Sequence, residues 1–236
     1  GETVAEANQL KAQVMANKQL MKRPLNLTLY EAIDKYIQSS DAVLSPATIR
    51  GYRTIQRNAF KIIMYCKLSQ LSTELLRDAV NTESKRTTGK KNPRQIKAKT
   101  VINEYGLITA VINTYAPALD CTVKLPQIEH NQHEISTPDV IYQIVKDTPI
   151  ELPALLAMWL SLTESEILGL TKSKSISSDG CYITIKEVIV KDEHNNAVVK
   201  NKGKQPTRDR TLRLPEYLKQ LIDKVETDQL VTLSGT

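Results

Sequence analysis

The chain contains 236 residues, 41% of them hydrophobic, with 32 lysines and arginines against 26 aspartates and glutamates. This length predicts one or two domains with packed cores, and the formal net charge of +6 favours a polyanionic partner. The three cysteines stand far apart and no apolar run approaches a membrane span, which argues against a secreted disulfide-rich protein or a membrane protein and favours the cytoplasm.

The N-terminal segment predicts a single helix. Residues 2–22 are rich in Ala, Gln, Lys and Met, and their apolar side chains recur at roughly helical spacing. Pro24 ends this helix, because the residue before a proline is biased away from the helical conformation. We interpret residues 1–25 as a helix and linker that precede the first domain.

Residues 26–119 predict a compact domain of four helices. Thr28 and Glu31 are spaced as in a capping box, and Ser45 is an N-cap followed by Pro46 at the first helical position. The predicted helices cover residues 28–39, 46–66, 71–82 and 97–115.

The second of these helices carries a row of cations. Its apolar side chains cluster on one side, while Arg50, Arg53, Arg57 and Lys61 form a stripe on the other. Solvated helix faces usually mix both signs of charge, because opposite charges one turn apart stabilise a helix. The purely cationic stripe therefore favours contact with DNA phosphates, and an ordinary exposed face is the alternative.

A basic segment follows in the same domain. Between residues 85 and 99 the chain has seven lysines and arginines and no acid, and Gly89 and Pro93 predict a loop. Beside the cationic stripe, this loop is interpreted as a clamp on the phosphate backbone rather than a merely solvated segment. The small, polar face of the helix after it would allow a close approach to a groove. The predicted DNA-binding residues are Arg50, Arg53, Arg57, Lys61, Lys90, Lys91, Arg94, Lys97, Lys99 and Asn103.

Residues 120–136 are interpreted as a linker between two domains, because they combine a proline with a run of polar residues. His130 and His133 lie three residues apart within this linker. We predict no metal site there, since the pair lacks the further ligands that a zinc site requires.

Residues 137–236 predict a second domain that mixes helices and strands. The helix over 151–162 is apolar nearly all round and is expected to be buried. Alternating apolar residues over 181–190 predict a strand. The remaining predicted elements are a helix over 137–147, strands over 197–199 and 210–214, and a helix over 216–225 that Pro215 opens.

The stretch from Trp159 to Leu170, W-L-S-L-T-E-S-E-I-L-G-L, resembles the G-L-R-x-S-E-x-x-x-L turn of tyrosine recombinases, the family of phage and conjugative-transposon integrases. A basic helical domain before it and a lysine-bearing hairpin after it stand in the family's order. The resemblance implies a mainly α fold with a small antiparallel β-sheet. Residues 26–119 would be a SAM-like core-binding domain, residues 137–236 the first part of an α+β catalytic domain, and residues 1–25 the end of an arm-binding region.

The resemblance also implies a function. Intact members of this family cut and rejoin double-stranded DNA at attachment sites through a phosphotyrosine bond, without a cofactor or metal. It therefore implies DNA integration and recombination by a phage or mobile element in the bacterial cytoplasm, at the nucleoid. Duplex DNA would be the partner, with self-association on DNA in the intact protein and no membrane partner.

Three catalytic positions follow from the resemblance. Lys204 matches the hairpin lysine that acts as general acid, with Lys202 as a second candidate, and Glu166 matches an acid that orients active-site groups. Thr163 stands where the family has its first catalytic arginine, and a threonine cannot supply a delocalised cation. Tyr217 is expected to face the core, and no H-x-x-R sequence or later tyrosine follows it.

We therefore expect this chain to bind DNA without breaking it. Two alternatives stay open: a non-catalytic DNA-binding clamp, and a helical protein-interaction module whose basic faces are only solvated. Binding to duplex DNA that weakens steeply with salt would argue against the protein-interaction module.

Overall fold

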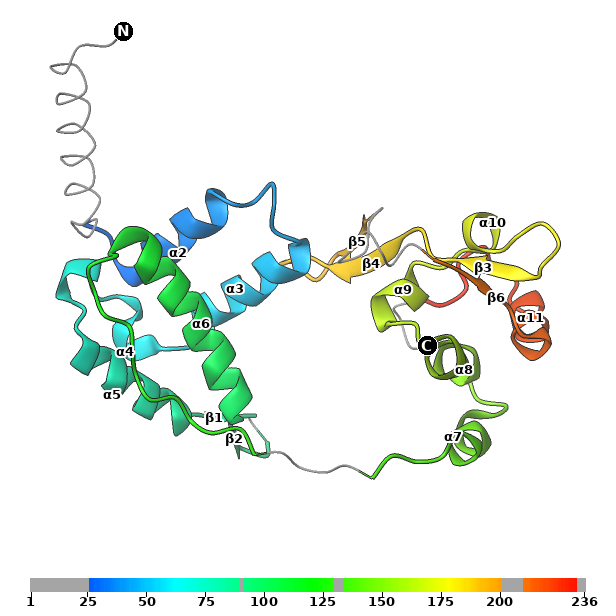
Figure 1. Ribbon diagram of the computed structural model, residues 1–236, viewed down its shortest axis with the longest axis horizontal. Helices are drawn as coiled ribbons and strands as arrows, with labels where there is room; N and C mark the ends of the chain where they lie inside the picture. Colours follow the sequence, from blue (N-terminus) through cyan, green and yellow to red (C-terminus); the bar gives the residue numbers. More distant parts are fainter. Residues whose placement is uncertain (1–25, 90, 130–133, 201–209, 233–236) are drawn as a thin grey trace, which may run out of the picture. The chain divides into compact units, whose positions relative to one another are not determined.

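The computed structural model describes residues 26–89, 91–129, 134–200 and 210–232 (Figure 1). The chain divides into two compact units, residues 1–131 and 132–236, which are described separately below. The fold is mainly helical with small antiparallel sheets, as the sequence predicted. The helix expected over residues 2–22 lies outside the described residues.

The first unit is a helical domain with one short hairpin. Its capping box is formed: the Thr28 backbone N–H donates to Glu31 at 2.8 Å and the Glu31 N–H donates to the Thr28 hydroxyl at 3.2 Å. Ser45 accepts from the Thr48 N–H at 3.2 Å, which confirms the second predicted helix start. The elements are α2 (Leu29–Gln38), α3 (Pro46–Asn58), α4 (Lys61–Met64), the 3₁₀ helix η1 (Leu68–Gln70), α5 (Thr73–Ser84), β1 (Thr87–Thr88), β2 (Arg94–Gln95) and α6 (Ala98–Tyr115).

The core of this unit lies between α6, α2 and α5. Ile33 of α2 and Ile108 and Ile112 of α6 are completely buried, at the helical spacing expected of an inward face. Residues 119–125 also pack against this core, and the Tyr105 hydroxyl donates to the Cys121 carbonyl at 2.7 Å. The segment interpreted as a linker therefore begins as part of the first unit's packed structure.

The helix expected over 46–66 is interrupted, and this part of the prediction is wrong. Helix α3 ends at Asn58 with Ala59 as its C-cap, and Phe60 adopts a left-handed conformation with φ of 48°. Phe60 is fully buried, and its N–H donates to a carboxylate oxygen of Glu83 at 2.7 Å. Burial of the ring and capture of its N–H by a residue of α5 stabilise a break that no local sequence signal shows. Lys61 consequently belongs to α4 rather than to α3.

The second unit combines helices with two small sheets. The predicted strand over 181–190 is two strands, because β3 pairs with β6 while β4 pairs with β5. Ile183 lies opposite Leu212 in the first pair, and Ile189 lies opposite Val199 in the second. The elements are α7 (Pro138–Val145), α8 (Glu151–Leu160), α9 (Glu164–Leu168), α10 (Lys172–Ser175), β3 (Tyr182–Thr184), β4 (Val188–Lys191), β5 (Ala197–Lys200), β6 (Thr211–Arg213) and α11 (Glu216–Asp223).

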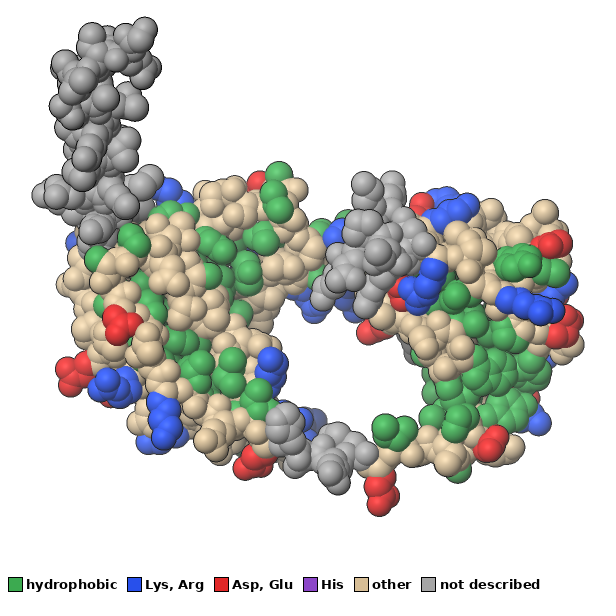
Figure 2. Space-filling model, in the orientation of Figure 1, with side chains coloured by type: hydrophobic (Ala, Val, Ile, Leu, Met, Phe, Trp, Pro, Cys, Tyr) green, Lys and Arg blue, Asp and Glu red, His purple; other side chains and the backbone are tan. Residues whose placement is uncertain are grey.

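Helix α8 is buried on one side only. Leu155 and Leu156 are completely buried, whereas Ile150 just before the helix is 59% exposed and Trp159 is 40% exposed. Figure 2 shows the resulting apolar surface over α8 and α11. The expectation that this helix is buried all round is therefore wrong for this structure.

Gly169 fixes the junction between α9 and β4. A Cβ atom at this position would lie well inside van der Waals contact with the Glu187 carbonyl group, so only glycine allows the observed approach. This contact holds the turn that follows α9 against the second sheet.

Candidate nucleic-acid interface and active-site region

The cations of the predicted stripe do not all face solvent. Arg50 and Arg57 of α3 and Lys61 of α4 are exposed. Arg53 instead forms an ion pair with Asp34 of α2 and bonds to Gln56 at 3.0 Å, and its side chain is only 20% exposed. An acid from another helix thus interrupts the stripe. The charge pattern within a single helix does not reveal this acid, because Asp34 lies 19 residues before Arg53.

The basic segment between α5 and α6 is a hairpin rather than an unstructured loop. Strands β1 and β2 pair antiparallel, with Thr88 opposite Arg94, and Gly89 takes a φ of 92° in the connection. Figure 2 shows lysine and arginine side chains beside this hairpin. The predicted contact residues Lys91, Arg94, Lys97, Lys99 and Asn103 are all exposed, and Lys90 lies outside the described residues.

Arg86, at the start of the same basic segment, has a structural role. Its guanidinium pairs with Glu83 of α5 and bonds to Glu104 of α6 at 2.9 Å. Burial raises the pKa of the Glu104 carboxyl above its ordinary value, although the charge of Arg86 opposes the rise. Arg86 ties α5 to α6 and is held by two carboxylates.

In the second unit, the buried carboxylate of Glu166 bonds to Thr163 and to Arg210. The Thr163 N–H and hydroxyl donate to one oxygen of Glu166 at 2.8 and 2.9 Å. Arg210, just before β6, donates from Nη1 to the other Glu166 oxygen at 3.1 Å and from Nη2 to the Ser161 carbonyl at 3.3 Å. Thr163 therefore caps α9, and Glu166 joins the turn between α8 and α9 to the strand β6.

The protonation state of Glu166 follows from these contacts. Burial favours the neutral acid, but the hydrogen bonds from Thr163 and the charge of Arg210 outweigh it and lower the pKa of Glu166 below its ordinary value. Glu166 is thus a carboxylate at neutral pH. A carboxylate that orients neighbouring groups is the role that the resemblance assigned to it, and this role stays a prediction.

Arg210 is the member of this group that sequence reasoning did not assign. It stands 44 residues from Glu166 in the chain, so no local spacing links the two. The available signal was its place directly before the strand that follows the predicted catalytic hairpin. Lys204 and Lys202, the candidates for the general acid, lie outside the described residues.

Tyr217 of α11 is held inside the second unit. Its hydroxyl donates to a carboxylate oxygen of the buried Glu151 at 2.6 Å and accepts from the Tyr142 hydroxyl at 3.3 Å. The hydrogen bond to Glu151 raises the pKa of Tyr217, which makes its phenolate less accessible at neutral pH. Tyr217 is therefore part of the packing between α7, α8 and α11.

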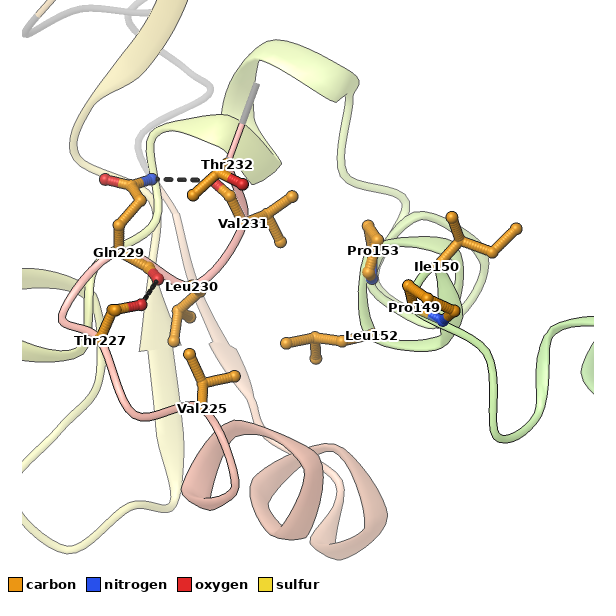
Figure 3. A pocket seen from close by; sticks show the side chains of 10 residues that line it. All are labelled: Pro149, Ile150, Leu152, Pro153, Val225, Thr227, Gln229, Leu230, Val231 and Thr232. Carbon is orange, nitrogen blue, oxygen red and sulfur yellow. Dashed lines mark hydrogen bonds between the residues drawn. The ribbon is translucent and has the colours of Figure 1, made fainter. Parts of the chain in front are cut away.

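An apolar cavity of about 640 Å³ opens between the start of α8 and the segment after α11 (Figure 3). The side chains that line it are Pro149, Ile150, Leu152, Pro153, Val225, Thr227, Gln229, Leu230, Val231 and Thr232. None of these side chains is ionisable, so the cavity is unsuited to phosphoryl transfer, which requires fixed charges. Among the described residues there is also no group of three potential metal ligands, and no helix is long and apolar enough to cross a membrane.

Comparison with known proteins identifies the fold. No protein-family model matches the sequence, and no curated protein sequence matches it. Solved structures of the Tn1549 transposon integrase do match. The complex with transposon right end DNA superposes with a TM-score of 0.63 at 12% identity, over 84% of this chain and 64% of that chain. A complex with circular intermediate DNA gives a TM-score of 0.64 at 13% identity, over 85% of this chain and 66% of that chain.

The chain thus spans somewhat less than two thirds of the length of these integrase chains. At this level of identity the similarity establishes the fold. The resemblance seen in the sequence is confirmed at that level: the described chain has the fold of the Tn1549 transposon integrase.

Proposed function

We propose that this chain is a DNA-binding protein of the tyrosine-recombinase type that binds duplex DNA through the first unit. The observation that carries the proposal is the shared fold with integrases whose structures contain DNA. The exposed cations Arg50 and Arg57 of α3, Lys61 of α4, and Lys91, Arg94, Lys97 and Lys99 around the hairpin support it. Cations that neutralise phosphates supply affinity that does not depend on sequence.

Salt dependence of binding tests this proposal. Fluorescence anisotropy with a duplex of about 30 base pairs should give a log K that falls linearly with log salt, by roughly 0.9 for each phosphate contacted. The double variant Arg50→Ala/Arg57→Ala should bind more weakly with a shallower slope. Arg77→Ala, which removes an exposed arginine from α5, is the matched control and should leave the slope unchanged.

Arg53→Ala separates the two kinds of arginine on α3. Because Arg53 is paired with Asp34, its loss should lower the melting temperature and leave the salt slope almost unchanged. The proposed function would be overturned if the wild-type protein did not bind duplex DNA at about 50 mM salt, or if its binding did not weaken as salt was raised.

We further propose that this chain does not cleave DNA at the rate of an intact recombinase. Position 163, where the family has its first arginine, is a threonine and supplies no guanidinium to stabilise a phosphorane. The Thr163 hydroxyl bonds instead to Glu166 at the start of α9. Loss of a comparable charge-stabilising donor slows catalysis by about 10²–10³-fold. Incubation with a nicked duplex followed by denaturing electrophoresis should show no covalent protein–DNA adduct, and an adduct would contradict this part of the proposal. Self-association on DNA and a mobile-element source remain predictions from the resemblance.

Protein binding by the second unit is the second candidate function. The observation that favours it is the apolar surface over α8, where Trp159 is exposed and the exposed Ile150 lines the cavity. Exposed apolar patches of this kind commonly mark interaction sites. A protein that fails to bind duplex DNA in the anisotropy experiment would favour this candidate.

A further inference from the structure

The Glu166–Arg210 pair presents its two charges unequally to solvent. The Glu166 side chain is 3% exposed, whereas the Arg210 side chain is 29% exposed. An anion that approaches this part of the surface therefore meets the guanidinium, while the compensating carboxylate lies beneath it. The bond from Nη2 to the Ser161 carbonyl fixes the guanidinium at the end of α8.

The surroundings of the guanidinium suit a phosphate. Thr163, whose hydroxyl bonds to the same carboxylate, is itself exposed, so the turn between α8 and α9 forms an accessible surface beside Arg210. A guanidinium is planar and delocalised, and it can bond to a carboxylate with some of its N–H groups and to a phosphate with others. A cation held in place before the ligand arrives also loses less conformational entropy on binding.

Arg86 of the first unit shows what a purely structural arginine looks like in this protein. It is similarly exposed, at 26%, but it faces two carboxylates, Glu83 and Glu104. That group carries one cation and two carboxylates, so an approaching phosphate would be repelled by the excess negative charge. In the Glu166–Arg210 pair the guanidinium is the exposed member, and the carboxylate beneath it is 3% exposed.

We propose that Arg210 is a DNA-contacting residue of the second unit, which binds a backbone phosphate at the turn between α8 and α9. The proposal rests on the function proposed above, namely that the chain binds duplex DNA. It adds a contact in the second unit to those of the first, and it places a guanidinium near Thr163 that comes from a distant part of the chain.

Chemical protection of the unmodified protein tests the contact directly. Phenylglyoxal modifies accessible arginines, and mass spectrometry of the whole chain with and without duplex DNA reports each site separately. DNA should reduce modification of Arg210 several-fold and leave that of Arg86 unchanged. Equal modification of Arg210 in both samples, under conditions where anisotropy shows binding, would overturn the proposal.

A substitution series gives an independent measurement. Arg210→Gln should reduce the slope of log K against log salt by about 0.9, the value for one phosphate, and Arg210→Lys should restore most of it. Arg213→Gln, which removes the exposed arginine at the end of β6, is the matched control and should retain the wild-type slope. If Arg210→Gln lowers the melting temperature but keeps both the slope and the affinity, Arg210 is only structural and the proposal is wrong.

The two proposals fail in different ways. Absence of salt-sensitive binding by the wild-type protein contradicts the proposed function itself. Salt-sensitive binding without protection of Arg210 leaves that function intact and contradicts only the contact in the second unit.

Discussion

Each unit contains an arginine that bonds to a largely buried carboxylate, Arg86 in the first unit and Arg210 in the second, but the partners of the two guanidinium groups differ. Arg86 in the first unit bonds to Glu83 and Glu104, whereas Arg210 in the second bonds to Glu166 and to the Ser161 carbonyl. In both units the carboxylates are more buried than the guanidinium. Two carboxylates hold the guanidinium of Arg86, whereas a carboxylate and a backbone carbonyl both bond to that of Arg210.

This difference separates an arginine that links two helices from the arginine that we propose as a DNA contact. Arg86 belongs to the run of cations between α5 and α6, yet its partners make it a link between two helices. Arg210 stands outside the predicted DNA-binding set, yet its exposed guanidinium faces solvent over a hidden carboxylate. The packing, rather than the sequence neighbourhood, decides which acids hold each of these arginines.

Removing Glu83 should have the largest effect on stability. Glu83→Ala leaves the buried Phe60 N–H without its acceptor and takes one of the two carboxylates from Arg86, so we expect a loss of about 3 kcal/mol in the free energy of unfolding. Denaturant unfolding followed by circular dichroism measures it. Asp78→Ala, an exposed position of the same helix, should change stability by less than about 0.5 kcal/mol. A loss below about 1 kcal/mol for Glu83→Ala would show that the group is not central to the first unit.

Alanine substitutions at two glycines, one in each unit, test how closely the backbone is packed around them. Gly169→Ala in the second unit forces a methyl group into the Glu187 carbonyl and should cost about 2 kcal/mol or more. Gly106→Ala on α6 of the first unit meets no atom within 4 Å and should stabilise by about 0.5–1 kcal/mol. Thermal unfolding of the two variants measures both effects, and equal effects would contradict the close approach of α9 to β4.

The pH dependence of Glu166 sharpens the contrast between the two groups. Glu166→Gln should lose about 1.5 kcal/mol at pH 7, because hydrogen bonds to a carboxylate are stronger than those to an amide. Since the pKa of Glu166 is lowered on folding, its contribution is present above the unfolded pKa and is lost as the pH falls through the folded value. The difference between wild type and variant should therefore shrink below about pH 4, as denaturant unfolding across pH would show.

Glu104 should give the smallest effect, with the opposite sign. Because its pKa is raised on folding, the folded state holds the proton more tightly, and this carboxyl destabilises the protein as the pH rises above its unfolded pKa. Relative to Glu104→Gln, the wild type should therefore lose a little stability between about pH 4.5 and neutrality. The same unfolding series tests this, and a wild type that gains stability over that interval would reverse the assignment.

Much of the local structure was predictable because its causes are local. The capping box at Thr28, the N-cap at Ser45 and the inward face of α6 all follow from side chains within one or two turns. The break at Phe60 was not predictable in this way, because the acceptor of its N–H belongs to Glu83, 23 residues later. The same holds for the pairing of Arg53 with Asp34, 19 residues apart, which removes one cation from the predicted stripe.

The residues of the candidate site also differ in whether their contacts are local or long-range in the chain. Thr163 and Glu166 could be placed together from the sequence, because an N-cap and the residue three positions later meet at the start of a helix. Arg210 could not, since only the pairing of β3 with β6 and the packing of α9 bring it to Glu166.

The sequence by itself determined the helical class of the first unit, the position of most helix starts, the excess of positive charge and the resemblance that the fold confirmed. These properties depend on periodicity, capping and composition, which act over a few residues. The tertiary structure alone decided where α3 ends, which side of α8 is exposed, and which arginines are bound to buried acids. Each of those outcomes depends on hydrogen bonds and contacts between residues far apart in the chain, which form only when the helices and strands pack together.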